Sequence, residues 1–231
     1  MELVVTRTDD GSDTVFRPDL NQHYHSTFGA VQETQQIFIE NGFLHAISKQ
    51  QDGSHDGSEP VHILEIGFGT GLNALMTLIE AEKRNINIDY TSVEPYPLDE
   101  TCWKLLNYPQ LPGSASYSGQ FSDLHRAGWN LPVTLTPTFN LHKVMDSVEH
   151  FQPECGKFGM VYFDAFGPDA QPELWTEEIF RKICMSMSPG AILVTYSVKG
   201  TVVRALRAAG FSTEKLPGPP GKRHILRATK I

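Results

Sequence analysis

The sequence predicts an α/β fold: a mostly parallel sheet with helices on both faces and an antiparallel hairpin at the C-terminal end. From residue 61 onward, short apolar runs of strand length alternate with segments whose apolar residues recur at helical spacing. A turn with three glycines joins the first of these strands to its helix. Two apolar runs near the C-terminus flank the turn-rich stretch PGPPGKR at 217–223, which is typical of a hairpin.

Residues 1–60 are expected to form an N-terminal extension, and residues 61–231 the core domain. In the extension, residues 14–17 predict a short strand. Residues 30–46 have the apolar spacing of a helix that is broken or capped at the Asn-Gly pair 41–42. Residues 50–60, QQDGSHDGSEP, lack an apolar anchor and predict a loop.

The core is predicted to contain a seven-stranded sheet. Its strands are expected at 61–66, 88–93, 133–139, 158–163, 191–196, 211–216 and 224–229. Its helices are expected at 71–83, 97–106, 142–150, 176–187 and 201–209. Thr176 is a suitable N-cap for the fourth helix, because its hydroxyl can accept from a free backbone N–H. Residues 107–132 form a long connection, and such length in a compact domain indicates a functional loop or an insertion.

Composition narrows the class of protein. No apolar run approaches the roughly 20 residues of a membrane span, and the N-terminus lacks the features of a signal peptide. Cys102, Cys155 and Cys184 are far apart without Cys-x-x-Cys spacing, so we expect reduced thiols. His23 and His25 have no partner at a metal-ligand spacing, so we expect no metal. The sequence therefore predicts a cytoplasmic protein that binds neither a membrane nor a metal.

The charge is unevenly distributed along the chain. The net charge is −8, yet from Lys199 onward eight residues are basic and one, Glu214, is acidic. A local basic face is typical of proteins that contact a phosphate backbone. A solvated helix face next to an ordinary edge hairpin would give the same pattern, and charge alone does not separate the two.

A glycine-rich loop marks the expected ligand edge, because ligands of open α/β sheets bind beyond the carboxyl ends of the strands. In LEIGFGTGL at 64–72, Gly67, Gly69 and Gly71 lie between strand and helix. Glycine permits positive φ and lets a ligand lie against bare backbone. A dinucleotide fingerprint would place its third glycine at position 72, which is Leu72. A nicotinamide or flavin dinucleotide is therefore the weaker hypothesis.

Two glutamates accompany this loop. Glu65 precedes the glycines, where a carboxylate favours a cationic head group, such as that of S-adenosylmethionine, and would repel a pyrophosphate. A purely structural role is the alternative for Glu65. Glu94 ends the second strand, where a carboxylate can accept from both hydroxyls of a ribose. Together the two acids and the three glycines form the signature of Rossmann-like class I methyltransferases that use S-adenosylmethionine.

Asp164 is a third acid at the same edge. It ends the apolar run 158–163 and is followed by a Phe-Gly-Pro turn that keeps the chain in the cleft. We expect Asp164 to lie beside the cofactor's methyl group, to accept a hydrogen bond from an acceptor amine and to orient it, with proton acceptance as a further role. The alternative is that Asp164 only caps the turn.

Several segments resemble the methyltransferase domain of the bacterial bifunctional tRNA wobble-uridine enzyme MnmC and its stand-alone relatives. DAFGP at 164–168 and QPELWT at 171–176 are similar to that family's Asp-Gly-Phe-Ala-Pro and Asn-Pro-x-x-Trp-Thr. NQHYHS at 21–26 and GAVQE at 29–33 are similar to its Asn-x-x-Tyr-His-Ser and Gly-Ala-x-x-Glu. The resemblance runs from about residue 14 to the C-terminal hairpin. The departures from the family pattern near the acceptor are Ala165, Gly167 and Gln171.

The resemblance implies methyl transfer to the primary amine of 5-aminomethyl-2-thiouridine at the wobble position, in the anticodon stem-loop of tRNA. It places Tyr24 and His25 near the acceptor, and we expect the cofactor's adenine near Asn140. Phe166 and Trp175 are expected to wall the cleft or to stack on a base, as unpaired RNA bases are commonly held. For Trp175 an ordinary core position is the alternative.

The same resemblance suggests how tRNA is held and what the chain lacks. The candidates for phosphate contacts, which would weaken in salt, are Lys199, Arg204, Lys222 and Arg223. At 231 residues the chain has no room for an FAD-dependent oxidase half. We therefore expect no FAD and a substrate that has already lost its carboxymethyl group.

Other functions stay open at this point. Methylation of another amine, in a small molecule or a protein, is the nearest alternative. A non-catalytic subunit that binds S-adenosylmethionine or tRNA is another. An aminopropyl transferase would normally carry Asp-x-x-Asp-Pro after the fourth strand, whereas here Asp169 follows the proline. A cofactor that binds only the native state raises the melting temperature of the protein. Melting temperatures measured with each candidate cofactor would therefore separate these classes.

Overall fold

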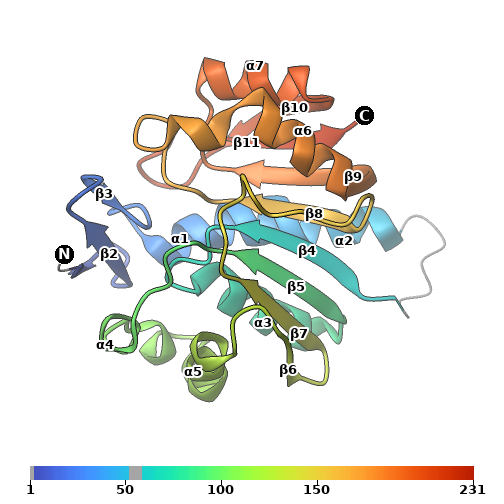
Figure 1. The fold of residues 1–231 in the computed structure, drawn as a ribbon. Coiled ribbons are helices and arrows are strands. Elements are labelled where there is room, and N and C mark those ends of the chain that lie inside the picture. The colour runs from blue at the N-terminus through green and yellow to red at the C-terminus, as the bar shows by residue number, and fades with distance from the viewer. Residues whose placement is uncertain (1–2, 52–58) are drawn as a thin grey trace.

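The computed structural model describes residues 3–51 and 59–231. In these residues the main sheet has eight strands in the order β10-β11-β9-β8-β4-β5-β7-β6, with helices on both faces (Figure 1). The strands are β4 Val61–Ile66, β5 Ile88–Val93, β6 Pro132–Thr136, β7 Phe139–Val144, β8 Phe158–Phe163, β9 Met187–Thr195, β10 Phe211–Pro217 and β11 His224–Lys230. The five central strands are parallel, whereas β6, β11 and β10 pair antiparallel. The predicted α/β class, with its C-terminal antiparallel hairpin, is confirmed.

The sheet has one strand more than the seven predicted. The strand expected at 133–139 is two strands, β6 and β7, which meet at a tight turn after Thr136. The helix expected at 142–150 is wrong, because β7 runs through its first residues. β7 buries alternate side chains, Phe139, Leu141 and Lys143, as a strand with one covered face does. A lysine at a buried position hid that alternation in the sequence.

The other four predicted core helices are present, although the one expected at 97–106 is limited to the short α4, and α5 is additional. The core helices are α3 Leu72–Arg84, α4 Glu100–Trp103, α5 Ser118–Arg126, α6 Glu177–Ser186 and α7 Gly200–Ala208. Thr176 caps α6 as predicted, since its hydroxyl accepts from the backbone N–H of Ile179 at 3.3 Å. The connection 107–132, for which a functional loop or an insertion was predicted, contains α5 and two short 3-10 turns, Tyr108–Gln110 and Ala115–Tyr117.

The N-terminal helix does not break at its Asn-Gly pair, as the sequence suggested. It continues from α1 Ala30–Thr34 through the π-helical segment η1 Gln35–Leu44 into α2 His45–Gln51. Gly42 packs closely against the sheet there: a Cβ at this position would lie 2.4 Å from Met160 Cε and 3.0 Å from Val194 Cγ2. The predicted loop 50–60 lies mostly outside the described residues.

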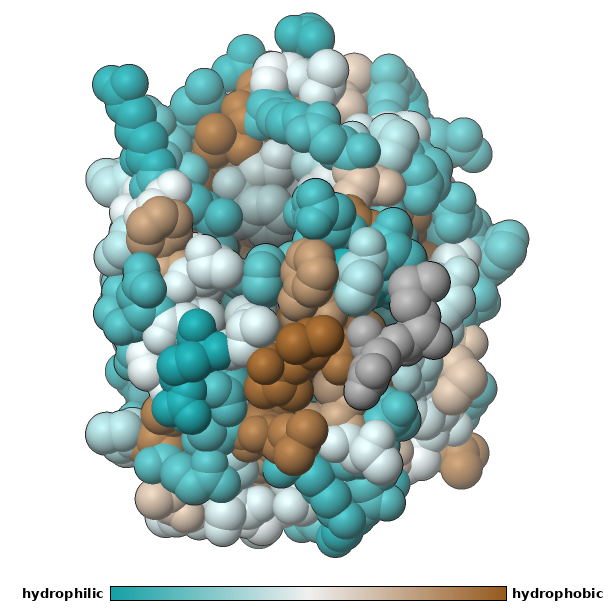
Figure 2. Space-filling model, turned by 90° about the vertical axis from the view of Figure 1, so that its left-hand side faces the viewer, coloured by the Kyte–Doolittle hydropathy of each residue, from teal (hydrophilic) through white to brown (hydrophobic). Residues whose placement is uncertain are grey.

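The hydrophobic core has two layers, one on each face of the sheet. The N-terminal helix and α3 cover one face, and α6 and α7 cover the other. A small sheet of β1 Val4–Arg7, β2 Asp13–Arg17 and β3 Gln22–His23 stands beyond the carboxyl ends of the parallel strands (Figure 1). Figure 2 looks onto this side of the molecule, where most of the surface is hydrophilic or neutral, with one larger apolar patch near the centre and smaller apolar spots around it.

Candidate functional site

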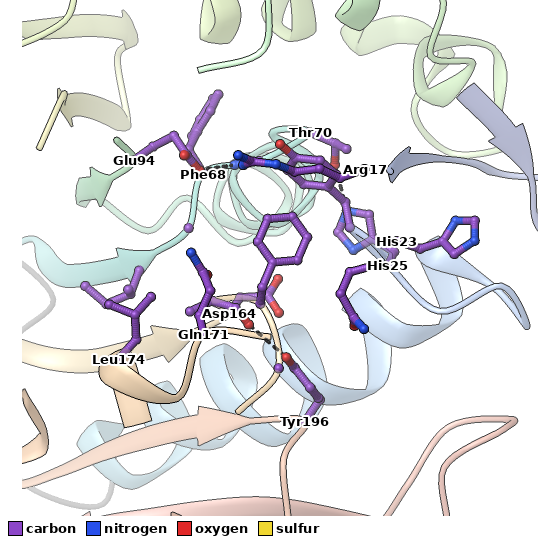
Figure 3. Close-up of a pocket in the computed structure, with 18 of the residues that line it drawn as sticks. Arg17, His23, His25, Phe68, Thr70, Glu94, Asp164, Gln171, Leu174 and Tyr196 are labelled. Atoms are coloured by element: carbon purple, nitrogen blue, oxygen red, sulfur yellow. Dashed lines mark hydrogen bonds between the residues drawn. The ribbon is translucent and has the colours of Figure 1, made fainter. Parts of the chain in front are cut away.

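A cavity of about 470 Å³ lies at the carboxyl ends of β4, β5 and β8. This volume is in the range of small-molecule sites. Its walls come from the glycine loop after β4, the segments after β5, β7, β8 and β9, and the N-terminal segment 17–33. Figure 3 shows Glu94 and Phe68 on one side of this space, Asp164, Gln171 and Tyr196 on another, and Arg17, His23 and His25 from the N-terminal segment. The site is thus assembled from segments that are far apart in the sequence.

Two of the three predicted glycines line the cavity. Gly67 has φ +94°, and a Cβ there would lie 2.7 Å from the carbonyl oxygen of Asp164. Gly69 has φ +48°, and a Cβ there would lie 2.8 Å from Tyr24 Cδ1. Gly71, with φ +73°, is the N-cap of α3 and packs against His125 outside the cavity. Gly67 and Gly69 thus allow Asp164 and Tyr24 to approach the loop closely at the cavity wall, and Gly71 serves the turn into α3.

Glu94 lines the cavity at the end of β5. Its carboxylate accepts from the backbone N–H of Gly69 at 3.1 Å and of Tyr96 at 2.8 Å. Burial raises the pKa of Glu94, and these backbone hydrogen bonds oppose the rise. The two bonds fix the carboxylate beside the glycine loop, and each oxygen keeps a lone pair for hydroxyl donors of a ligand.

Asp164 lies on the cavity wall directly after β8. Its Oδ2 accepts from Asn73 Nδ2 at 2.8 Å, and Asn73 is oriented in turn by the hydroxyl of Thr34, which donates to Asn73 Oδ1 at 3.0 Å. Burial first, and then the negative charge of Glu33, raise the pKa of Asp164 well above its ordinary value. A carboxyl group in such a position can hold a proton at a pH where an exposed aspartate cannot.

Glu65 does not reach the cavity, contrary to our expectation. It is fully buried in β4, where Ser92 Oγ donates to its Oε2 at 2.6 Å. Burial raises the pKa of Glu65 to about 8, so the neutral acid is favoured at neutral pH. A neutral side chain beneath the glycine loop does not supply the charge that the sequence argument assigned to it. This arrangement fits the structural alternative.

Asn140 is also remote from the cavity. It lies at the start of β7, where it pairs with Asp89 and its Nδ2 donates to Asp89 Oδ1 at 2.9 Å. The ligand edge is at the other end of β7, since Val144 pairs with Val93 next to Glu94. The error followed from the misplaced third strand. The segment that follows the actual strand lines the cavity with Ser147, Val148 and Glu149.

The structure brings Tyr24, His25 and Phe166 together at the cavity. Tyr24 and Phe166 meet edge to face with ring centroids 4.9 Å apart. The buried His25 has its Nε2 2.6 Å from Thr70 Oγ1, and burial lowers the pKa of its ring. These residues form an aromatic wall beside Asp164 that carries no charge at neutral pH.

Trp175 belongs to the core and does not line the cavity, which corrects the expectation that it walls the cleft or stacks on a base. It is 5% exposed and packs against Phe163 and Tyr196. Its Nε1 donates to the carbonyl oxygen of Phe166 at 2.8 Å. Trp175 thus holds the backbone of the segment after Asp164 from behind.

The four basic candidates separate into two groups. Lys222 lines the cavity, where its Nζ lies 3.2 Å from Glu33 Oε1. The other three, Lys199, Arg204 and Arg223, are exposed and outside the cavity lining. Lys199 pairs there with Asp169. Lys222 is therefore turned inward and is not placed for a surface phosphate contact.

Many residues of the cavity were not predicted from the sequence, among them Arg17, Glu33, Asn73 and Tyr196. Glu33 stood in the quoted GAVQE stretch, but nothing in the sequence said that α1 would reach the ligand edge. Arg17 lies between two aromatic rings, 5.2 Å from the Tyr96 centroid and 5.7 Å from that of Phe166. These contacts join elements that only the folded chain brings together.

Within 3–51 and 59–231, no three His, Cys, Asp or Glu side chains form a group that could hold a metal ion. In the same part of the chain, no helix has the length and apolar character needed to cross a bilayer.

Comparisons with known proteins agree with this geometry. Residues 128–231 match a family described as S-adenosyl-L-methionine-dependent methyltransferase. The bifunctional protein MnmC for tRNA 5-methylaminomethyl-2-thiouridine biosynthesis is 34% identical in Aromatoleum aromaticum, over 95% of this chain and 34% of that protein. In Pseudomonas syringae it is 29% identical over 92% of this chain and 32% of that protein. The chain spans about a third of the length of these relatives.

Solved structures support the fold. The crystal structure of MNMC2 from Aquifex aeolicus has a TM-score of 0.76 at 22% identity, and covers 98% of this chain and 70% of that one. Spermidine synthase from Thermotoga maritima has a TM-score of 0.56 at 13% identity, covering 99% and 72%. Sequence and fold thus agree: residues 128–231 match an S-adenosyl-L-methionine-dependent methyltransferase family, and the chain is similar to about a third of MnmC and has the fold of MNMC2.

Proposed function

We propose that this chain methylates the primary amine of 5-aminomethyl-2-thiouridine at the wobble position of tRNA, giving the 5-methylaminomethyl product. The observation that carries the proposal is the cavity in which Glu94, the glycine loop and Asp164 border one space. The relatives' involvement in tRNA 5-methylaminomethyl-2-thiouridine biosynthesis supports the choice of acceptor. A tRNA substrate would place the protein in the cytoplasm.

The residues at one end of the cavity fit S-adenosylmethionine. Gly67 and Gly69 line the cavity, and Glu94 suits the two ribose hydroxyls. Val148, in the segment after β7, would contact the adenine in place of the expected Asn140. When bound, this cofactor supplies an electrophilic methyl group on a sulfonium centre. The acids around the cavity favour that positive charge.

Asp164 is the proposed catalytic residue. An alkyl amine is an ammonium ion at neutral pH and must lose a proton before its nitrogen can offer a lone pair. The Asp164 carboxylate, held by Asn73, would accept a hydrogen bond from this nitrogen and orient it. Its raised pKa suits it to take the proton. Tyr24 and Phe166 would exclude water on the acceptor side.

The rim of the cavity offers contacts for the anticodon stem-loop. Phe28 and Tyr96 line the cavity and are 51% and 60% exposed. Exposed aromatic rings can stack on unpaired bases, and such contacts contribute about 1–3 kcal/mol per base. The exposed Arg204 and Arg223 stay candidates for phosphate contacts, which would weaken in salt.

Nucleoside mass spectrometry tests the proposal. The protein is incubated with S-adenosylmethionine and tRNA from cells that lack this methyltransferase activity. We expect 5-aminomethyl-2-thiouridine to be converted to its methylated form, and Asp164→Asn to abolish most of the conversion. Asp169→Asn, five residues away and exposed, is the matched control and should retain activity. Intact cofactor binding without conversion of any tRNA nucleoside would overturn the assignment and point to another amine.

A further inference from the structure

The tip of the C-terminal hairpin places Lys222 in the lining of the cavity. Between β10 and β11, the N–H of Gly218 donates to Arg223 O at 3.2 Å, and the N–H of Lys222 donates to Pro219 O at 2.9 Å. A Cβ on Gly218 would lie 2.3 Å from the Lys222 carbonyl oxygen. On the other side of the tip, the Phe28 ring packs against Gly221, where a Cβ would be 2.1 Å from Phe28 Cδ2. The backbone around Lys222 is therefore held from both sides.

Inside the cavity, Lys222 joins the segments that border Asp164. Its Nζ lies 3.2 Å from Glu33 Oε1 on α1 and 5.1 Å from the centroid of the Tyr196 ring after β9. The other oxygen of Glu33 accepts from Ser26 N at 2.7 Å, so the carboxylate is fixed at both ends. The Tyr196 hydroxyl donates to Ala165 O at 2.8 Å, next to Asp164. Glu33 is 6% exposed, so this ion pair is shielded from solvent on the acid's side.

We propose that Lys222 is a positioning residue for the methylation site: its ion pair with Glu33 holds a positive charge near Asp164 and keeps that carboxyl able to accept the amine's proton. The inference rests on the proposed function, and it replaces the phosphate contact that the sequence suggested for Lys222. The proton in question passes from the acceptor nitrogen to Asp164 Oδ. That transfer requires an Asp164 that is not already protonated.

The groups around Asp164 are mostly acidic. The titratable groups coupled to Asp164 from the neighbouring elements are Glu33, Glu65, Tyr90, Tyr196 and Lys222, and Arg17 and Glu94 line the same cavity. Among the five coupled groups Lys222 is the cation, and it lowers the pKa of Asp164, whereas burial and the two glutamates raise it. His25 is close to Glu33, but burial lowers the pKa of its ring and favours the neutral form. Without Lys222, burial and the acids would favour the protonated form of Asp164, and the acids would favour that of the amine.

The test is the pH dependence of single-turnover methylation of tRNA by Lys222→Met and Lys222→Arg. The rate should rise with pH as Asp164 ionises, and in Lys222→Met the midpoint should move up by as much as about one pH unit, since loss of a nearby positive charge favours the protonated carboxyl. Below the midpoint the rate should fall by as much as about tenfold, with little change in KM for tRNA. Lys222→Arg should keep the wild-type midpoint. Lys215→Met, an exposed lysine on β10, is the matched control.

An unshifted midpoint in Lys222→Met, with a raised KM for tRNA and a weaker salt dependence, would overturn the inference and restore the phosphate contact. If wild type methylates no tRNA nucleoside, the proposed function itself fails. A second measurement does not depend on the substrate: a carbon-13 NMR titration of the Asp164 carboxyl in wild type, Lys222→Met and Lys222→Arg. Equal titration midpoints in wild type and both variants would overturn the inference even if tRNA were methylated. The same spectra show whether each variant is folded.

Discussion

Replacing Glu94 with Gln removes one charge from the cavity and keeps the shape of the side chain. In wild type both carboxylate oxygens accept from backbone N–H groups, of Gly69 and of Tyr96. The amide of Gln offers one acceptor oxygen, and its NH₂ group would face the other N–H donor. A ribose would lose hydrogen bonds at the same side chain. Glu94→Gln should therefore weaken cofactor binding and shift the loop that carries Gly69.

The expected size follows from the value of hydrogen bonds to charged groups, about 1.5–3 kcal/mol each. Loss of one such bond to the ribose raises Kd for S-adenosylmethionine about 10- to 100-fold, because about 1.4 kcal/mol corresponds to a factor of ten. Loss of the backbone bond lowers the free energy of unfolding by a further amount of about 1 kcal/mol or more. The two effects are separate quantities and are measured separately.

Isothermal titration calorimetry with S-adenosylmethionine measures the first effect, and urea unfolding without ligand measures the second. Glu154→Gln is the control, since that side chain is 73% exposed and pairs with Lys157 on the surface. It should bind the cofactor like wild type. A Glu94→Gln variant whose Kd stays within about twofold of wild type would refute the assignment of Glu94 to the ribose, since that change is far below one hydrogen bond.

Three further predictions concern the fold around the site. Gly42→Ala should lower the free energy of unfolding by about 1–3 kcal/mol through overpacking against Met160. Gly119→Ala, in α5 with open space around it, should be neutral or stabilising by up to about 1 kcal/mol. Equal urea midpoints for the two variants would contradict this difference. Trp175→Ala should lower the free energy of unfolding by about 3–5 kcal/mol, and Trp175→Phe should lower it much less. If a folded Trp175→Phe variant mainly loses affinity for tRNA, Trp175 stacks on a base and is not an ordinary core residue. The pKa of Glu65 is raised from 4.5 to about 8, so its stabilising contribution is complete below pH 4.5 and is lost as the pH rises toward 8. Between pH 5 and 8 the free energy of unfolding of wild type should therefore fall relative to that of Glu65→Gln. If the two free energies change with pH in parallel, Glu65 is not a buried acid that titrates in this range.

The parallel part of the fold could be predicted because its strands carry their own signal. β4 and β8 are covered on both faces, and such strands read as continuous apolar runs of about six residues in the sequence. The hairpin β6-β7 at the edge of the sheet lacks that signal. Its second strand buries Lys143, whose Nζ lies 4.5 Å from the Trp129 centroid and donates to His125 O at 2.8 Å. A lysine that is buried through aromatic and carbonyl partners cannot be distinguished from an exposed one by hydropathy.

The candidate site could be predicted where its residues sit at strand ends. Gly67, Glu94 and Asp164 were all expected at the carboxyl edge, and all three line the cavity. The same reasoning failed for Asn140, because the strand before it was placed too early, and for Glu65, because the periodicity of β4 turns that side chain away from the cavity.

The acceptor side depends on contacts over long sequence separations. Glu33 reaches the cavity because α1 docks beside α3, and Lys222 because a tight turn redirects the end of β10. Neither residue has a local pattern that distinguishes it from a surface charge. Sequence analysis therefore assigned Lys222 to the basic tail, and the structure instead pairs it with Glu33 across roughly the whole length of the chain.

The measurement that tests the central claim most directly compares two tRNA preparations in a single-turnover methylation assay. One carries 5-aminomethyl-2-thiouridine at the wobble position, and in the other this uridine still bears its carboxymethyl group. If Asp164 holds a primary amine, the first preparation is methylated and the second is not. Asp164→Asn should then fail to methylate the first preparation while it still binds the cofactor. Equal methylation of both preparations, or full activity in Asp164→Asn, would contradict the assigned acceptor chemistry.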